Sequence, residues 1–128
     1  MKTNMFHRET YRSSNKNIDK HIDNKEQVKG NNIFAEYTPS YPNLYVVYSY
    51  GYHFPMYVYD EDSNMWFANS DRYSVSTSKH QSQARPSQPI DMFLNTDQLM
   101  TILRLGSYME WSIQKAQSDN VETYRQGV

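Results

Sequence analysis

Cysteine is absent from the chain, and glycine is scarce, with four residues in 128. A chain without cysteine forms no disulfide bond, binds no zinc through thiolates and has no thiol nucleophile. None of the glycines lies between Tyr52 and Leu105. A glycine-rich loop that cradles phosphate is therefore excluded from that part of the chain.

Long hydrophobic runs are also absent. No segment approaches the roughly 20 apolar residues that a membrane-spanning helix requires. The N-terminal residues MKTNMFHRETYRSSNKN lack the apolar core of a signal peptide. Hydrophobic residues make up 38% of the chain, below the roughly 45–50% of ordinary globular domains. These features predict a cytoplasmic protein.

Neither sign of charge is in excess, because the formal net charge is -1. This balance argues against a strongly basic nucleic-acid-binding protein. The distribution is uneven, since residues 1–43 hold seven Lys or Arg against five acids. A second basic segment, residues 71–90, holds Arg72, Lys79 and Arg85 against Asp71 alone.

Aromatic residues are plentiful, with twelve Tyr, five Phe and two Trp. In residues 44–50 both alternating faces are apolar, which predicts a central strand covered on both sides. The polar segment 60–64 predicts a hairpin turn, and the sequence as a whole predicts a three- to five-stranded antiparallel sheet with aromatic cross-strand pairs. The expected strands are 33–37 at an edge, 44–50, 54–59, 65–68 and 72–76, with 89–94 as a further short candidate.

Helical features follow the predicted sheet. Thr96 and Asp97 are typical of a helix start, and apolar residues then recur on one face. Gly106 favours a break between two helices, and one continuous helix over 97–117 is the alternative. The sequence therefore predicts an α+β fold in which one or two C-terminal helices pack on one face of the antiparallel sheet.

Three regions are expected along the chain. Residues 1–32 are polar, with apolar residues too sparse to hold a helix on a core, and predict a flexible, mildly basic arm. Residues 33–117 predict a single α+β domain. Residues 118–128 predict a frayed tail.

Polar and charged side chains are concentrated in the segment from Tyr73 to Arg85. It joins a cation pair, Lys79 and Arg85, to His80 and five Ser or Thr hydroxyls. Such groups suit a phosphate or a carboxylate, because an arginine guanidinium can donate two parallel hydrogen bonds to the anion and hydroxyl groups can donate others. Residues 77–88 are expected to form a loop long enough to have a function, and a purely structural loop is the alternative.

Support for catalysis or metal binding is weak. The histidines are His7, His21, His53 and His80, and no two have metal-ligand spacing on a helix. No frame for a nucleophilic serine is present, so we expect neither an enzyme nor a cofactor. The tyrosines of residues 44–59 resemble a base-stacking platform, but this segment contains no charged residue, so protein contact is favoured.

The segment 50–105 resembles a family of small uncharacterised proteins from bacteriophages and mobile elements. The resemblance implies an accessory protein without assigned chemistry, and it makes inhibition of a host defence complex a natural hypothesis. It depends on residues that match the pattern of that family, which are His53-Phe54-Pro55, Trp66, Asn69, Tyr73-Ser74, Ser76-Thr77-Ser78, His80-Gln81 and Arg85-Pro86.

We therefore expect a non-enzymatic interaction protein, in the host-cell cytoplasm, that binds a host or phage protein. A small nucleic-acid-binding regulator using the arm and the 72–85 segment is the alternative, and an enzyme acting on a phosphorylated ligand through His80 is a third. The oligomeric state is open, a homodimer included. The predicted partner-binding residues are Arg72, Tyr73, Lys79, His80, Gln81 and Arg85.

Overall fold

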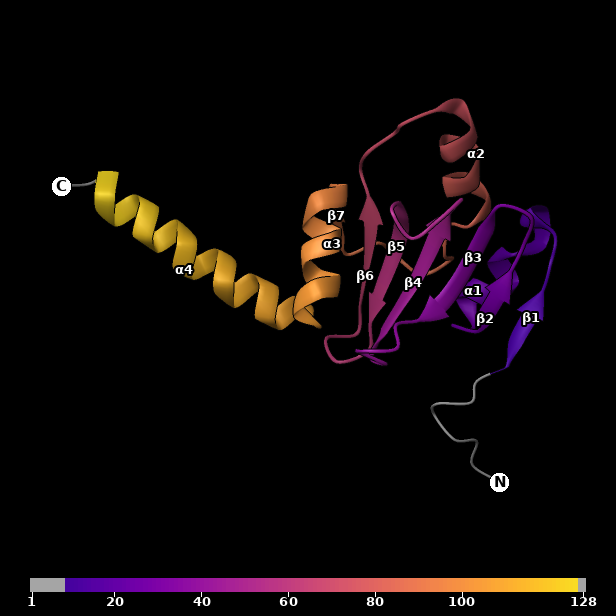
Figure 1. Cartoon of the computed structure of the whole chain (residues 1–128), viewed down its shortest axis with the longest axis horizontal. Coiled ribbons are helices and arrows are strands. Elements are labelled where there is room, and N and C mark those ends of the chain that lie inside the picture. Colours follow the sequence, from indigo (N-terminus) through magenta and orange to yellow (C-terminus); the bar gives the residue numbers. More distant parts are fainter. Residues whose placement is uncertain (1–8, 127–128) are drawn as a thin grey trace, which may run out of the picture.

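The computed structural model describes residues 9–126, and the side chains as far as Asp119. A seven-stranded sheet forms the centre, and its strands lie side by side in the order in which they occur along the chain (Figure 1). The elements are β1 (Thr10–Arg12), the 3-10 helix η1 (Asn15–Asn17), α1 (Asp19–Asp23), β2 (Gln27–Lys29), β3 (Ile33–Tyr37), β4 (Leu44–Ser49), β5 (Pro55–Asp60), β6 (Met65–Asn69), α2 (Val75–Gln83), β7 (Met92–Leu94), α3 (Thr96–Leu105) and α4 (Tyr108–Gln126).

The sheet is mixed, so the prediction of a three- to five-stranded antiparallel sheet is wrong. Strands β2 to β6 form an antiparallel meander. The outer strands β1 and β7 pair in parallel with their neighbours. Parallel neighbours need a crossover connection, and here η1 with α1 and then α2 form the two crossovers. The sequence did not predict β1 or either crossover, whereas β7 lies within the candidate strand at residues 89–94 and only its parallel pairing was not expected.

Strand β4 is the central strand, as its sequence predicts. All six residues from Leu44 to Ser49 are buried, because apolar clusters cover both faces. Tyr45 and Val47 pack on the side of α1 and α2, whereas Val46 packs on the side of α3. The predicted break at Gly106 is also confirmed, since α3 ends there with a φ of 94°.

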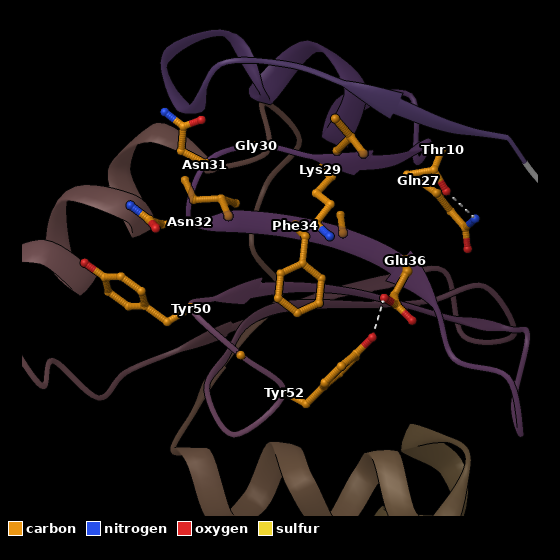
Figure 2. Close-up of a pocket in the computed structure, with 14 residues that line it drawn as sticks. Thr10, Gln27, Lys29, Gly30, Asn31, Asn32, Phe34, Glu36, Tyr50 and Tyr52 are labelled. Carbon is orange, nitrogen blue, oxygen red and sulfur yellow. Dashed lines mark hydrogen bonds between the residues drawn. The ribbon is translucent and has the colours of Figure 1, made fainter.

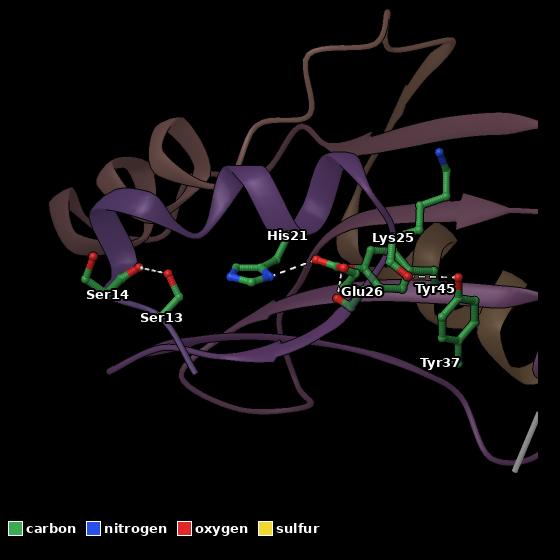
Figure 3. Close-up of polar contacts among 7 residues, drawn as sticks. All are labelled: Ser13, Ser14, His21, Lys25, Glu26, Tyr37 and Tyr45. Atoms are coloured by element: carbon green, nitrogen blue, oxygen red, sulfur yellow. Dashed lines mark hydrogen bonds and ion pairs between the residues drawn. The ribbon is translucent and has the colours of Figure 1, made fainter. Parts of the chain in front are cut away.

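The N-terminal arm differs from the flexible segment expected over residues 1–32. Within its described part, β1, η1, α1 and β2 form, and Ile18, Ile22 and Val28 are buried in the core. Two core tyrosines fix the turn between α1 and β2 (Figure 3). The Tyr45 hydroxyl donates to the Glu26 carbonyl over 2.6 Å, and the Tyr37 hydroxyl donates to the Lys25 carbonyl over 3.0 Å. Residues 1–8 lie outside the described residues.

Helix α2 replaces the strand over 72–76 and the loop over 77–88 that the sequence predicted. A capping box starts it, because the Ser74 side chain accepts from the Thr77 amide and the Thr77 side chain accepts from the Ser74 amide. The side chains that it buries are Thr77, His80 and Gln81, with Ala84 next in the same helical period. This face is mostly polar, so a search for apolar periodicity does not find it.

Helix α4 projects away from the sheet (Figure 1). Its start is held by the Asp60 carboxylate, which accepts from the Tyr108 amide over 2.8 Å, and by the Tyr108 ring stacked on Phe67. Side chains from Ile113 to Asp119 are all exposed. The helix runs to Gln126, where the sequence predicted a frayed tail from residue 118.

Candidate functional site

The predicted contact residues divide between the surface and the core. Arg72, Lys79 and Arg85 are exposed, as is Tyr73 at 62%. In contrast, His80 and Gln81 are only 5% and 4% exposed. The last two therefore support the surface from beneath.

His80 and Gln81 attach α2 to the sheet. His80 Nδ1 and Ser49 Oγ are hydrogen-bonded over 2.7 Å. Gln81 Nε2 donates to the carbonyl of Asn69 over 3.1 Å and to that of Asp71 over 3.2 Å. Burial, together with the neighbouring charge of Lys79, lowers the pKa of His80.

A Ser–His pair is the starting arrangement of many nucleophilic sites. Here Ser49 is fully buried on β4, so its hydroxyl is enclosed by the core. The ring of Tyr50 packs against His80 with the ring centres 5.0 Å apart. In this structure the pair holds α2 in place.

Arg72 and Arg85 come together near the phenol of Tyr57. Burial raises the pKa of Tyr57, and the positive charges of Arg85 and Arg72 partly offset this rise. The Tyr57 hydroxyl donates to the Gln81 carbonyl over 2.5 Å. Arg72 Nη1 and Gln81 Nε2 also donate to the same carbonyl, that of Asn69, over 3.0 and 3.1 Å. The fold thus brings three of the six predicted residues, Arg72, Gln81 and Arg85, close to Tyr57.

Tyr73 lies in a different network, at the start of α3. Its ring packs on Phe54, with centres 4.8 Å apart, and its hydroxyl donates to Thr96 Oγ1 over 3.0 Å. Asp71 accepts from the Thr96 amide over 2.9 Å, and this bond lowers the pKa of Asp71. Asn69 Nδ2 also donates to Thr96 Oγ1, over 2.9 Å. These bonds fix the segment that leads into α2.

A second candidate site, which the sequence did not predict, is a hollow on the other side of the sheet (Figure 2). Helix α3 packs against β5 and β6 there, whereas no helix of the described residues lies over β1 to β3 on this side (Figure 2). We call this uncovered side of β1–β3 the open face. The hollow has a volume of about 560 Å³ and is bordered by β2, β3 and the turn from Tyr50 to Tyr52.

Three rings form an aromatic triad at the hollow: Phe34, Tyr48 and Tyr52. Phe34 stacks on Tyr48 with centres 5.0 Å apart, and Tyr52 meets both rings edge-on at 5.1 and 5.0 Å. The Tyr52 hydroxyl donates to Glu36 Oε1 over 2.9 Å, which raises the pKa of Tyr52. Tyr52 is 61% exposed and Phe34 is half-buried, whereas Tyr48 is only 5% exposed. The accessible surface of the triad is therefore formed by Phe34 and Tyr52, with Tyr48 packed beneath them.

Polar side chains surround the triad. Lys29, Asn31 and Asn32 line the hollow. No hydrogen bond or ion pair from these three side chains is found among the described residues. Gln27 Nε2 donates to Thr10 Oγ1 over 3.4 Å at the far end. The arrangement combines aromatic rings with free donors and amides, which can hold a flat and polar ligand.

The sequence did contain a pattern for this face. Residues 33–37 alternate between buried and half-buried side chains, as expected where one side of a strand is open. Gln27 and Lys29 flank the buried Val28 in the same way. This pattern alone does not predict the open face, because β2 is only three residues long and lies in the segment that the sequence predicts to be a flexible arm.

Among the described residues, no cluster of three or more His, Asp or Glu could hold a metal ion. No helix in that part of the chain has the length and apolarity needed to cross a bilayer. No protein-family model, no curated protein and no solved structure matches the chain, so the resemblance to a phage-encoded family stays a prediction.

Proposed function

We propose that this chain is a non-enzymatic interaction protein that binds a macromolecular partner through the open face of β1–β3. The observation that carries the proposal is the aromatic triad, which no helix in the described part of the chain covers and which lies beside the polar side chains of Lys29, Asn31 and Asn32. Protein surfaces used for recognition combine a few rigid aromatic anchors with a polar rim. A hollow between them provides room for a group of the partner.

The exposed side of α2 is the second contact surface of this proposal. Its exposed side chains are Lys79 on the helix, Arg72 and Tyr73 just before it and Arg85 just after it. His80 and Gln81 keep the helix in position. The two surfaces are separate, because α2 packs on the side of the sheet that carries α1. A role in inhibiting a host defence complex stays a prediction that depends on the family resemblance alone.

A photo-crosslinking experiment compares the two surfaces directly. Tyr52 and Tyr73 are matched positions, with exposures of 61% and 62%. Each is replaced in turn by p-benzoylphenylalanine in the full chain, which is then irradiated inside expressing cells. We expect a discrete crosslinked product from position 52. Products from neither position would contradict the proposal, and products from position 73 alone would move the contact to α2.

A second candidate function, nucleic-acid binding, is favoured by one specific observation. The folded arm places Lys29 beside the aromatic triad, since Lys29 and Phe34 are partners in the register of β2 and β3. A cation next to exposed rings is the combination that single-stranded nucleic acids require. The sequence alone did not predict this proximity, because the arm was expected to be flexible.

A further inference from the structure

We propose that the hollow binds single-stranded nucleic acid, with a base stacked on the aromatic triad and a phosphate held by Lys29 and Arg12. This inference rests on the proposed function, because it names the class of partner that the open face recognises. It follows from three features of the hollow: its aromatic rings, its positive charges, and strands β2 and β3 that are already paired on both sides.

The rings are presented in a way that suits bases. Phe34 lies in the middle of the hollow, with Tyr52 at its side and Tyr50 at one end (Figure 2). Phe34 is half-buried, and Tyr50 and Tyr52 are exposed, so all three rings retain accessible surface. Bases stack on such rings whatever their sequence, because every base has a flat face. A duplex hides these faces, so the strand must be single.

The charges on the open face favour an anion. Arg12 is the register partner of Lys29, and partners in adjacent strands share one side of the sheet. Both cations therefore lie on the side of Phe34. Glu36, the carboxylate among the residues that line the hollow, already accepts a hydrogen bond from Tyr52. The free cationic groups remain donors, as a phosphodiester requires.

Free amides complete the site. Asn31 and Asn32 follow β2 at the rim of the hollow. An amide donates and accepts at once, which matches the edges of unpaired bases. The volume of about 560 Å³ lies within the roughly 300–1,000 Å³ of small-molecule sites, so the hollow accommodates nucleotide-sized groups.

The backbone around the hollow disfavours an extended peptide. Such peptides commonly bind by adding a strand to a free sheet edge. Strands β2 and β3 are each paired on both sides, so neither offers an edge inside the hollow. Recognition there must use side chains and flat rings, as nucleic-acid-binding sheets do.

Fluorescence anisotropy with the full chain tests the inference. The probes are fluorescein-labelled eight-nucleotide strands of deoxythymidine and of uridine. Binding should weaken as the salt concentration rises. A plot of the logarithm of the association constant against the logarithm of the salt concentration should have a slope of about -0.7 per phosphate contacted. Lys29→Glu should weaken binding at least about tenfold, whereas Lys115→Glu, the same change at an exposed lysine on α4, should leave it within about twofold. Phe34→Leu keeps the apolar contact with Tyr48 and should still lower affinity about fivefold or more.

The outcomes separate this inference from the proposed function. Absence of binding by the unchanged protein, or equal weakening by Lys29→Glu and Lys115→Glu, would overturn the nucleic-acid site. Equal affinity for a duplex of the same length would also overturn it. If a protein crosslinks at position 52 while neither strand binds, the inference fails and the interaction function stands. Circular dichroism of each variant shows whether a loss of binding reflects a loss of fold.

Discussion

The two halves of the sheet differ in how they are covered. Strands β4 to β6 lie between helices α1 and α2 on one side and α3 on the other, and β4 is buried along its whole length. Strands β1 to β3 are covered on one side only, and β3 alternates between buried and half-buried residues. The covered half therefore provides most of the apolar burial, and the open half provides an accessible surface at little cost in stability.

This contrast separates stability from recognition in a small chain. A domain of this size gains little from each additional element, so the absence of a helix over β1–β3 leaves a face that nothing else in the described residues uses. The aromatic triad spans the boundary, since Tyr48 belongs to β4 and Phe34 to β3. Substitutions on the two sides of that boundary should therefore change the free energy of unfolding by different amounts.

The largest expected effect is in the covered half. Phe67 is fully buried and stacks on Tyr108. Phe67→Ala should lower the free energy of unfolding by about 3–5 kcal/mol, through lost burial and the cavity left behind. The matched change in the open half, Phe34→Ala, should cost less than about 2 kcal/mol, because Phe34 is already half-exposed. Urea unfolding measures both, and equal losses would break the comparison.

A somewhat smaller effect is expected beneath the open half. Ile22 is the fully buried residue of α1. Ile22→Ala should cost about 2–4 kcal/mol, and the loss should be local, because α1 packs chiefly against β2. Hydrogen exchange should therefore show faster exchange in β1 and β2 than in β4 to β6. Uniform acceleration over the whole sheet would show that the open half has no separate stability.

The sequence predicted the covered half better than the open half, for a physical reason. Residues 44–49 are apolar on both faces, and that composition requires a central strand. Gly106 also ends α3 as expected: a Cβ there would lie 2.5 Å from the Tyr41 ring. Each of these features could be predicted because it depends on a single residue or on one continuous segment of the sequence.

The elements that the sequence missed depend on contacts between distant residues. Ile18, Ile22 and Val28 lie on separate short elements and share one face only after the chain has folded. The buried side of α2 is largely polar, and His80 is accommodated there because Ser49 of β4 bonds to it. Of the candidate site, the exposed cations near α2 were predictable, whereas the hollow required the position of β2 beside β3.

The helix cap of α2 gives a still smaller effect. Ser74→Ala removes the side chain that accepts from the Thr77 amide over 3.1 Å. Loss of such a cap should lower the free energy of unfolding by about 1 kcal/mol. Ser82→Ala, on the exposed side of the same helix, is the matched control and should cost less. If both changes have the same effect in urea unfolding, the capping box does not determine where α2 begins.

The smallest expected effect is a dependence of stability on pH at the junction of α2 with β4. Because burial lowers the pKa of His80 below its ordinary value of 6.5, the unfolded chain takes up a proton at a higher pH than the folded chain does. The stability contributed by neutral His80 is therefore complete above pH 6.5 and decreases as the pH falls towards the folded-state pKa. His80→Gln should flatten this part of the profile of unfolding free energy against pH, since glutamine does not titrate. His53→Gln changes an exposed histidine in the turn between β4 and β5, and this variant should leave the decrease in place. An unchanged slope in the His80 variant would mean that its hydrogen bond to Ser49 tolerates protonation, and that the attachment of α2 does not depend on a neutral imidazole.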